Sequence, residues 1–441
     1  MSLLERARRT AAARPLVGAT SGTFALRVGS AGLLLGTAVI LARELGAAGY
    51  GAYSYATAWA GVLATPAILG FDRLLVRSVA AWEAVGSWGL MRGLLRRGNQ
   101  IVGAASAMLV LLAAVVGGLL LHEPFRGPFL LGLALVPLIA LTGVRKGAMQ
   151  GLGRVVLGNV PDLLVRPTLL FIGLAVVVVG GSGLDPAGAM AVNVVATGAA
   201  FLVCVVLLRR AQPARLAAAK PGYETRAWLA TATPMMFVSG MLAINYHLAE
   251  VLLGSLDNAH AVGVFVVANR VTQVMTFLPY AVNAVLAPRF ARLYALGRFG
   301  ELQALVTLAV RRLTLATVPL AVALVLFQTP VLHVFGNEFE SAGTALVILT
   351  VGQLVSIVAG SVAVLLMMTG YERDAAAGVG LGLLVNLTLG TVLIPAMGAD
   401  GAALATAGSL ACWNGVLALL VHKRLRIDAT LWGGFSRTSG T

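Results

Sequence analysis

The chain has 441 residues, of which 59% are hydrophobic and only 11% are charged, and its mean hydropathy is +0.91. About a quarter of the residues in a soluble domain are charged, so this composition excludes a soluble globular enzyme as well as a disordered chain. The 52 glycines and 16 prolines fit a polytopic helical membrane protein. The net charge of +15 would suggest nucleic-acid binding if its basic residues formed one patch, so their distribution along the chain decides its meaning.

Twelve apolar runs are each long enough to cross the hydrocarbon core of a bilayer, which takes about 20 residues. They lack the alternating pattern of barrel strands, and backbone in lipid must otherwise satisfy its hydrogen bonds within helices. The sequence therefore predicts an all-α, polytopic membrane protein of about twelve transmembrane helices. The predicted spans are 20–42, 51–71, 99–121, 128–144, 159–180, 188–208, 229–253, 261–288, 313–331, 342–368, 375–396 and 401–422.

The basic residues lie almost entirely on one side of this topology. Segments on the side of the N-terminus hold 27 of the 32 Lys and Arg residues, and the opposite loops hold two. The positive-inside rule therefore places both termini in the cytoplasm. Orientation explains most of the net charge, so we expect these loops to contact the headgroups of membrane lipids and expect no nucleic-acid partner.

Three short matches, in the same order along the chain, indicate that the sequence repeats itself at an interval close to half its length. Such a repeat is typical of transporters built from two halves of the same hand, related by an axis along the membrane normal. It predicts two six-helix lobes related by a pseudo-two-fold axis. The matched segments are 149–154 with 368–373, 183–189 with 398–403, and 51–53 with 263–265.

The predicted domain order follows from this repeat and from a polar segment between the sixth and seventh spans. We expect an N-terminal six-helix lobe, a cytoplasmic linker, a C-terminal six-helix lobe and a basic cytoplasmic tail. Their bounds are 1–208, 209–228, 229–422 and 423–441.

Three arginines lie inside predicted spans, where a charged side chain costs about 2.5 to 3.5 kcal/mol at the bilayer centre. The first of them, Arg27, shares a polar face of the first span with Thr23 and Ser30. This face must meet water or an anion, or the guanidinium must bond to carbonyls of neighbouring helices. The first interpretation predicts a substrate cavity, because guanidinium groups grip phosphate oxygens.

The eighth span carries a similar polar face. Asn269, Gln273 and Thr276 follow one another at helical spacing, and Arg270 lies beside Gln273 at the edge of this face. We interpret Arg270 and these neighbours as cavity-lining residues of the second lobe. A structural hydrogen bond from Arg270 to a neighbouring helix is the alternative.

The third arginine, Arg166, lies one turn after Asp162 in the fifth span, between Pro161 and Pro167. This spacing predicts an ion pair between Asp162 and Arg166 that stabilises a proline-bent helix. The alternative is that Arg166 lines the entrance for a substrate.

Glu250, in the seventh span, is an intramembrane acid with no evident basic partner nearby in the sequence except His247 on an adjoining face. Such an acid is a candidate for coupling transport to a proton or cation gradient, and Asp162 is a second candidate. A solvated carboxylate at the membrane interface is the alternative interpretation of Glu250.

No metal or cofactor site is predicted. Cys204 and Cys412 both lie inside apolar runs, so the sequence supports neither a disulfide framework nor a cysteine metal site. Gly378, Gly380 and Gly382 lack the preceding strand that a phosphate-binding loop requires, and helix packing explains them.

Several short motifs resemble those of a known family. Ala42-Arg43-Glu44-Leu45-Gly46 with Tyr50-Gly51-Ala52-Tyr53 is similar to its A-R-x-L-G-x-x-x-Y-G-x-Y pattern. Further landmarks are Leu286-Ala287-Pro288-Arg289, Phe335-Gly336-Asn337-Glu338-Phe339 and Gly401-Ala402-Ala403-Leu404-Ala405. On these residues the chain resembles the polysaccharide or O-antigen flippases of the multidrug/oligosaccharidyl-lipid/polysaccharide exporter superfamily.

The resemblance implies a transporter and not an enzyme, with two lobes around a cation-lined cavity. Such a flippase moves a polyprenyl-diphosphate-linked oligosaccharide to the outer leaflet of the bacterial inner membrane by alternating access. Our own hypothesis is that a proton or sodium gradient drives this transport, and no cofactor is expected. Arg27 resembles the cavity arginine of related flippases, and Arg270 is its nearest counterpart in the second lobe. The implied partners are the lipid-linked glycan, membrane lipids, a polysaccharide polymerase and other assembly proteins.

Three alternatives stay open. A multidrug or cation antiporter of the same fold would need acids in its cavity, and only Asp162 and Glu250 lie in predicted spans. A membrane glycosyltransferase, polymerase or ligase would usually show paired acids or a large exoplasmic loop. A nonspecific scramblase or structural assembly partner is the third.

Overall fold

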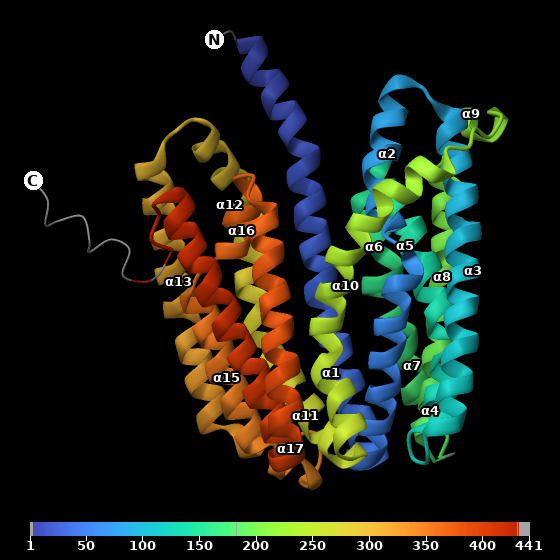
Figure 1. The fold of residues 1–441 in the computed structure, drawn as a ribbon, viewed down its shortest axis with the longest axis vertical. Coiled ribbons are helices and arrows are strands. Elements are labelled where there is room, and N and C mark those ends of the chain that lie inside the picture. Colours follow the sequence, from blue (N-terminus) through green and yellow to red (C-terminus); the bar gives the residue numbers. More distant parts are fainter. Residues whose placement is uncertain (1–2, 182, 430, 432–441) are drawn as a thin grey trace, which may run out of the picture. The chain divides into compact units, whose positions relative to one another are not determined.

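The computed structural model describes residues 3–181, 183–429 and 431, and for residues 3–21, 23, 24, 238 and 284 it describes the backbone only. Every regular element in this part of the chain is a helix (Figure 1). Ten helical stretches are long and apolar enough to cross a membrane. The chain is therefore a polytopic, all-α membrane protein, as the sequence predicts.

Two of the ten stretches each contain one glycine with non-helical dihedral angles. In α1 (Leu3–Ile68) this is Gly46, with φ 65° and ψ −178°, and in α17 (Glu372–Leu425) it is Gly398, with φ 53° and ψ −126°. Residues with a Cβ rarely adopt such positive φ values, so glycine allows the chain to reverse at both points. Each glycine separates two segments of spanning length, so the ten stretches supply the twelve predicted crossings.

The described chain divides into two compact units, each with its own core. Unit 1 comprises Met1–Glu44 and Ala56–Ala243, and unit 2 comprises Leu45–Tyr55 and Ile244–Thr441. The predicted linker, 209–228, belongs to unit 1. So do residues 229–243 at the start of the predicted second lobe.

Unit 1 is organised around α5, which packs against α2, α3, α6 and α8. Gly147 and Gly151 of α5 allow this helix to approach α2 closely: a Cβ atom at Gly147 would overlap the carbonyl oxygen of Asp72, and one at Gly151 would lie 2.7 Å from Cβ of Val79. The helices of unit 1 after α1 are α2 (Phe71–Val85), α3 (Trp88–Leu120), α4 (Arg126–Gly132), α5 (Leu135–Gly151), α6 (Val155–Val160), the π-helical turn η1 (Pro161–Val165), α7 (Arg166–Val179), α8 (Pro186–Ala211), α9 (Ala214–Ala218) and the first part of α10 (Thr225–Leu256).

The segment after α9 is docked on the beginning of α3. The amide of Gly222 donates to the carbonyl of Gly89 at 2.9 Å, and Arg92 Nη1 donates to the carbonyl of Ala219 at 2.6 Å. A Cβ atom at Gly93 would overlap the carbonyl oxygen of Gly222, so glycine is required for this close approach. The predicted linker is thus held by hydrogen bonds to unit 1.

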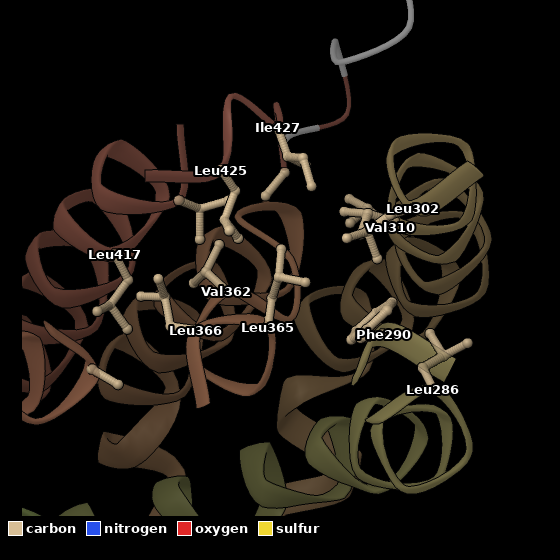
Figure 2. Packing of buried hydrophobic residues seen from close by; sticks show 14 residues of the cluster. Leu286, Phe290, Leu302, Val310, Val362, Leu365, Leu366, Leu417, Leu425 and Ile427 are labelled. Carbon is tan, nitrogen blue, oxygen red and sulfur yellow. The ribbon is translucent and has the colours of Figure 1, made fainter. Parts of the chain in front are cut away.

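The core of unit 2 includes a cluster of apolar side chains from α12, α13, α16 and α17 (Figure 2). Phe290, Leu302, Val362 and Leu417 are almost fully buried in it, and Ile427, beyond the last helix, joins them. The helices of unit 2 after α10 are α11 (Ala259–Thr272), the 3-10 turn η2 (Gln273–Thr276), α12 (Phe277–Ala295), α13 (Phe299–Leu326), α14 (Gln328–His333), the 3-10 turn η3 (Asn337–Ala342), α15 (Gly343–Val358), α16 (Val362–Met368) and α17.

Residues 45–55 of α1 belong to unit 2 because they make a reciprocal backbone contact with α11. A Cβ atom at Gly51 would overlap the carbonyl oxygen of Ala259, and one at Gly263 would overlap that of Ala47. The matched segments 51–53 and 263–265 are separated by a fixed number of residues. The same separation relates Ala47 to Ala259 and Gly51 to Gly263. Equivalent residues of the two repeats therefore contact each other symmetrically, as a local pseudo-two-fold axis requires.

The helical segment after Gly46 begins against a side chain from η3. Glu338 Oε2 accepts a hydrogen bond from the amide of Ala47 at 2.9 Å. A carboxylate at this position satisfies a backbone N–H that has no partner within the helix and interacts favourably with the helix dipole. Glu338 therefore acts as a cap for the segment that carries the glycine contact.

We predict that Gly51→Ala and Gly263→Ala each destabilise the protein by about 1–3 kcal/mol or more, because the added methyl group forces two packed helices apart. Thermal unfolding of the purified protein in detergent measures the effect. Gly103→Ala is the matched control, because a Cβ atom there meets nothing within 4 Å. Equal melting temperatures for Gly51→Ala and Gly103→Ala would contradict the assigned contact.

Candidate functional site

Unit 1 contains a pocket of about 460 Å³, lined by Ile68 of α1 and by residues of α2, α5, η1, α7 and α8. We call it the charged pocket, because three cations and two carboxylates line it. Two of the cations come from segments that the sequence places on the cytoplasmic side of the membrane. The charged residues are Arg73, Lys146, Arg166, Asp72 and Asp162.

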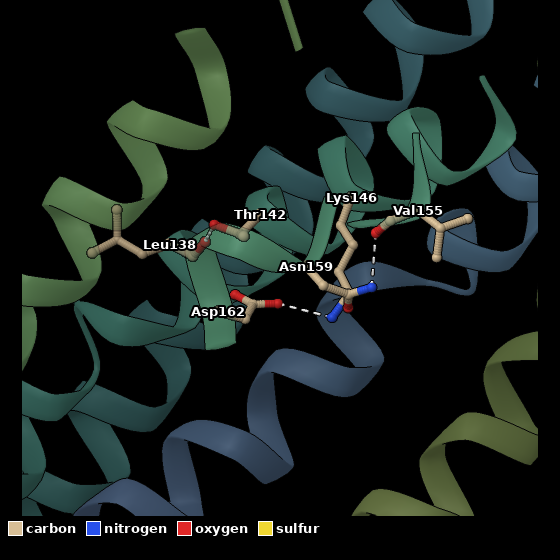
Figure 3. A network of polar contacts seen from close by, with 6 residues as sticks. All are labelled: Leu138, Thr142, Lys146, Val155, Asn159 and Asp162. Carbon is tan, nitrogen blue, oxygen red and sulfur yellow. Dashed lines mark hydrogen bonds and ion pairs between the residues drawn. The ribbon is translucent and has the colours of Figure 1, made fainter. Parts of the chain in front are cut away.

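Asp162 lies in the π-helical turn η1, where it forms an ion pair with Lys146 of α5 (Figure 3). The distance between Lys146 Nζ and Asp162 Oδ2 is 2.9 Å. The predicted ion pair between Asp162 and Arg166 is therefore wrong. Reasoning from spacing along one helix does not include a cation supplied by a neighbouring helix.

Arg166 is instead bound by α8. Its Nη2 donates to Asn193 Oδ1 at 3.2 Å, and the hydroxyl of Thr197 donates to the same oxygen at 3.4 Å. Asn193 is fully buried, so this acceptor is in a fixed position. A guanidinium has five N–H donors, and among the described residues Asn193 accepts one, so Arg166 retains donors for a ligand in the pocket.

Asp72 adds a second carboxylate to the pocket lining. Its Oδ1 atom is buried and has no hydrogen-bond partner among the described residues. A buried polar atom without a partner costs about 1–3 kcal/mol, which a donor entering the site would relieve. With three cations and two acids, the charged pocket is suited to an anion that also carries hydroxyl donors.

A second group of polar residues lies in unit 2, and we call it the Arg270 cluster (Tyr50, Tyr246, His247, Glu250 and Arg270). The guanidinium of Arg270 donates a hydrogen bond to the hydroxyl of Tyr50 and interacts electrostatically with Glu250 and Tyr246. Tyr50 and Glu250 are buried, with 3% and 7% of their surface exposed. Arg270 is thus a half-buried cation held by the segment 45–55 that the glycine contact attaches to α11.

Glu250 has two basic neighbours in the structure, of which the sequence indicates only His247. His247 Nδ1 lies 3.8 Å from Glu250 Oε2, and Arg270 lies within electrostatic range on α11. Arg270 belongs to the next helix, so only packing brings it near Glu250. His247, which the sequence places on the adjoining face, is thus a neighbour of Glu250 in the structure.

The other predicted residues of the first span are distributed differently. Arg27 is exposed on α1, and Ser30 is buried with 3% of its surface exposed. The side chain of Thr23 lies outside the described residues. Arg27 and Arg166 both belong to unit 1, whereas Arg270 belongs to unit 2.

The polar face of the eighth span is interrupted. The α-helical segment α11 ends at Thr272, and Gln273 and Thr276 lie in the 3-10 turn η2. The hydroxyl of Thr276 donates to the carbonyl of Gln273 at 2.7 Å. Asn269 lies before the turn η2, whereas Gln273 and Thr276 lie in it. The α-helical spacing that placed these three residues on one face therefore does not continue through η2.

Arg73, Lys146 and Asp72 were missed as site residues because they follow apolar runs and were assigned to cytoplasmic loops. In the structure, α2 includes Asp72 and Arg73, and α5 includes Lys146. A sequence signal was present: Thr142, Lys146 and Gln150 recur at every fourth position, which continues a polar helix face beyond the apolar run.

A sequence profile of polysaccharide biosynthesis proteins matches residues 19–294, which is more than half of the chain. The chain belongs to that family. It is also 25% identical, over 391 residues, to the probable low-salt glycan biosynthesis flippase Agl15 of Haloferax volcanii. The alignment covers 88% of this chain and 79% of that relative.

Solved structures show the same fold. An inward-facing multidrug resistance MATE family transporter of the MOP superfamily superimposes with a TM-score of 0.73 at 13% identity, over 89% of this chain and 94% of that one. The lipid II flippase MurJ superimposes with a TM-score of 0.72 at 15% identity, over 92% and 87%. The polysaccharide family expected from the sequence motifs is confirmed by the profile match, and these structures show that the fold is shared.

We predict that Tyr50→Phe lowers stability by about 1.5–3 kcal/mol, the usual contribution of a hydrogen bond to a charged group. The substitution leaves the half-buried Arg270 without its hydroxyl acceptor. Thermal unfolding in detergent tests this, with Tyr223→Phe as the control, because Tyr223 is exposed and its ring remains under Arg97. An unchanged melting temperature for Tyr50→Phe would remove the tyrosine from the Arg270 cluster.

Proposed function

We propose that the protein is a flippase for a polyprenyl-diphosphate-linked oligosaccharide or polysaccharide repeat unit, which it moves from the cytoplasmic to the outer leaflet of the inner membrane. The observation that carries this proposal is the charged pocket, which contains Arg73, Lys146 and Arg166 inside a bundle of membrane-spanning helices. Membership of the polysaccharide biosynthesis family supports it.

A diphosphate headgroup needs fixed positive charge when it leaves water, because an unpaired anion in a medium of low dielectric constant is strongly disfavoured. Arg166 suits this task, since Asn193 of α8 orients its guanidinium and a guanidinium can bind phosphate oxygens in a bidentate manner. Lys146 lines the same pocket, although its ammonium group forms an ion pair with Asp162. Arg27 and Arg270 are proposed to extend this positive path in their respective units.

Transport by alternating access follows from the same chemistry. A charged, hydrated headgroup cannot cross hydrocarbon exposed, so its binding site must open to one side of the membrane at a time. We infer that both termini lie in the cytoplasm, from the distribution of Lys and Arg. A polysaccharide polymerase and other assembly proteins are the proposed downstream partners.

A multidrug or cation antiporter is the competing function, and its best support is the likeness to the MATE transporter. An organic cation would require an excess of acidic groups in its pocket. The charged pocket holds three cations against two acids, and Lys146 already pairs with Asp162. This balance favours an anionic cargo.

We predict that Arg73→Gln and Arg27→Ala each reduce transfer of the linked glycan to the outer leaflet at least tenfold, since the loss of one charged hydrogen bond is worth about 1.5–3 kcal/mol. Glycan at the outer surface is measured in cells whose own flippase gene is deleted, at matched expression. Arg96→Gln is the control, because Arg96 is exposed on α3 and does not line the pocket. Full transfer by both variants would refute the proposed cargo site.

We propose that Glu250 couples transport to a proton or sodium gradient, with Asp162 as the second candidate. Glu250→Gln removes the only carboxylate of the Arg270 cluster, so transport by this variant should no longer respond to collapse of the gradient. Transport in proteoliposomes with and without an ionophore is the measurement. If the variant and the parent respond alike, Glu250 has no coupling role.

A further inference from the structure

Unit 2 contains a pocket with lining positions that correspond, through the repeat, to lining positions of the charged pocket of unit 1. Thr142 of the charged pocket and Ser361 of the second pocket are related by the same interval as Met149 and Met368 of the matched segments. Thr197 lines the charged pocket and Trp413 lines the second pocket. Their separation along the sequence lies between the smallest and the largest separation of the matched segments. The two pockets therefore share equivalent lining positions in the two repeats.

The two pockets differ completely in charge. No Lys, Arg, Asp, Glu or His lines the pocket of unit 2 among the described residues. Its polar lining consists of amides, hydroxyls and one indole, and we call it the amide pocket. These residues are Asn283, Gln353, Ser356, Ser361, Trp413 and Asn414.

Hydrogen bonds between helices hold four of these side chains in place. Asn414 Nδ2 donates to Ser356 Oγ at 3.0 Å, which joins α17 to α15. Ser361 donates to Asn283 Oδ1, which joins the start of α16 to α12. The amide pocket is therefore built from groups that are already oriented before any ligand enters.

Two further groups retain hydrogen-bonding capacity. Gln353 makes no side-chain hydrogen bond to another described residue and lines the amide pocket from α15. Trp413 lines it from α17, and its buried Nε1 has no acceptor in the described part of the chain. An amide offers both donors and acceptors, as a sugar hydroxyl does, so the two are complementary.

The backbone is also irregular at this place. Between α15 and α16 the helix is interrupted at residues 359–361, and Gly360 has φ +83°. Non-helical backbone inside a membrane span is tolerated where it is buried in protein or lines a cavity, and Gly360 lines the amide pocket. The interruption thus places irregular backbone beside a neutral, polar site.

We propose that the amide pocket binds one uncharged sugar ring of the transported glycan. This inference rests on the proposed flippase function for its cargo. The pocket has a volume of about 170 Å³, which is the volume that about six water molecules occupy in liquid water. This volume suits one sugar ring and not an oligosaccharide. The repeat thereby divides recognition: the charged pocket of unit 1 takes the diphosphate, and the amide pocket of unit 2 takes a sugar.

The experiment measures binding of free monosaccharides to the purified protein in nanodiscs by saturation-transfer NMR. Glucose, galactose, mannose and N-acetylglucosamine are the neutral probes, and glucuronate is the charged probe. We expect at least one neutral sugar to bind, and glucuronate to bind at least tenfold more weakly than that sugar, because no cation lines the described part of the pocket. Gln353→Leu and Trp413→Phe should each weaken binding of the neutral sugar about tenfold.

Trp228→Phe is the matched control, because Trp228 of unit 1 also has a buried Nε1 without an acceptor among the described residues but does not line the amide pocket. It should bind sugar as the parent does. Inorganic pyrophosphate should bind the parent, Gln353→Leu and Trp413→Phe equally. Loss of sugar binding in both pocket variants, with the control intact, supports the proposal even if the protein proves not to transport glycans.

No binding of any neutral sugar by the parent, or unchanged binding by both pocket variants, would overturn the assignment of the amide pocket. That result would leave the flippase function standing if the parent still transfers the linked glycan to the outer leaflet. Failure of glycan transfer by the parent would instead refute the flippase function itself.

Discussion

The reciprocal glycine contact between α11 and the segment after Gly46 determines how unit 2 is assembled. Because neither Gly51 nor Gly263 carries a side chain, the two helical segments approach until their backbones touch. This approach brings the hydroxyl of Tyr50 to the guanidinium of Arg270, and Glu338 bonds the first amide of the same segment. Without this approach Arg270 would lose Tyr50 as a partner, and a charge inside the protein that loses its partner is strongly destabilising. The Arg270 cluster therefore depends on the contact between the two glycines.

Charged groups inside this membrane protein are not distributed evenly between its two repeats. Two pockets that share equivalent lining positions are charged in unit 1 and neutral and amide-lined in unit 2. A lipid-linked glycan has the same division, because its diphosphate carries the charge and its sugars carry hydroxyl groups. On the proposed function, the two pockets would recognise these two parts of the cargo separately.

The sequence predicts most reliably those features of the fold that one physical effect dominates. A span must be apolar over about 20 residues whatever it packs against, so the apolar runs of the sequence predict the helices that can cross the membrane. The family resemblance was correct for a related reason, since its motifs mark turns such as Gly46, whose positive φ is a local requirement. Partners of charged residues were predicted less well, because Lys146 competes with Arg166 for Asp162 from a different helix.

Taken alone, the sequence determined that this protein is a helical membrane protein with a duplicated architecture, since hydropathy, charge asymmetry and repeat interval are properties of the chain itself. Only the tertiary structure decided which polar residues meet. Lys146 with Asp162, Arg166 with Asn193, and Arg270 with Tyr50 are all pairs on different helical segments. Helix packing sets such distances through side-chain volume and backbone approach, and no periodicity along a single helix encodes them.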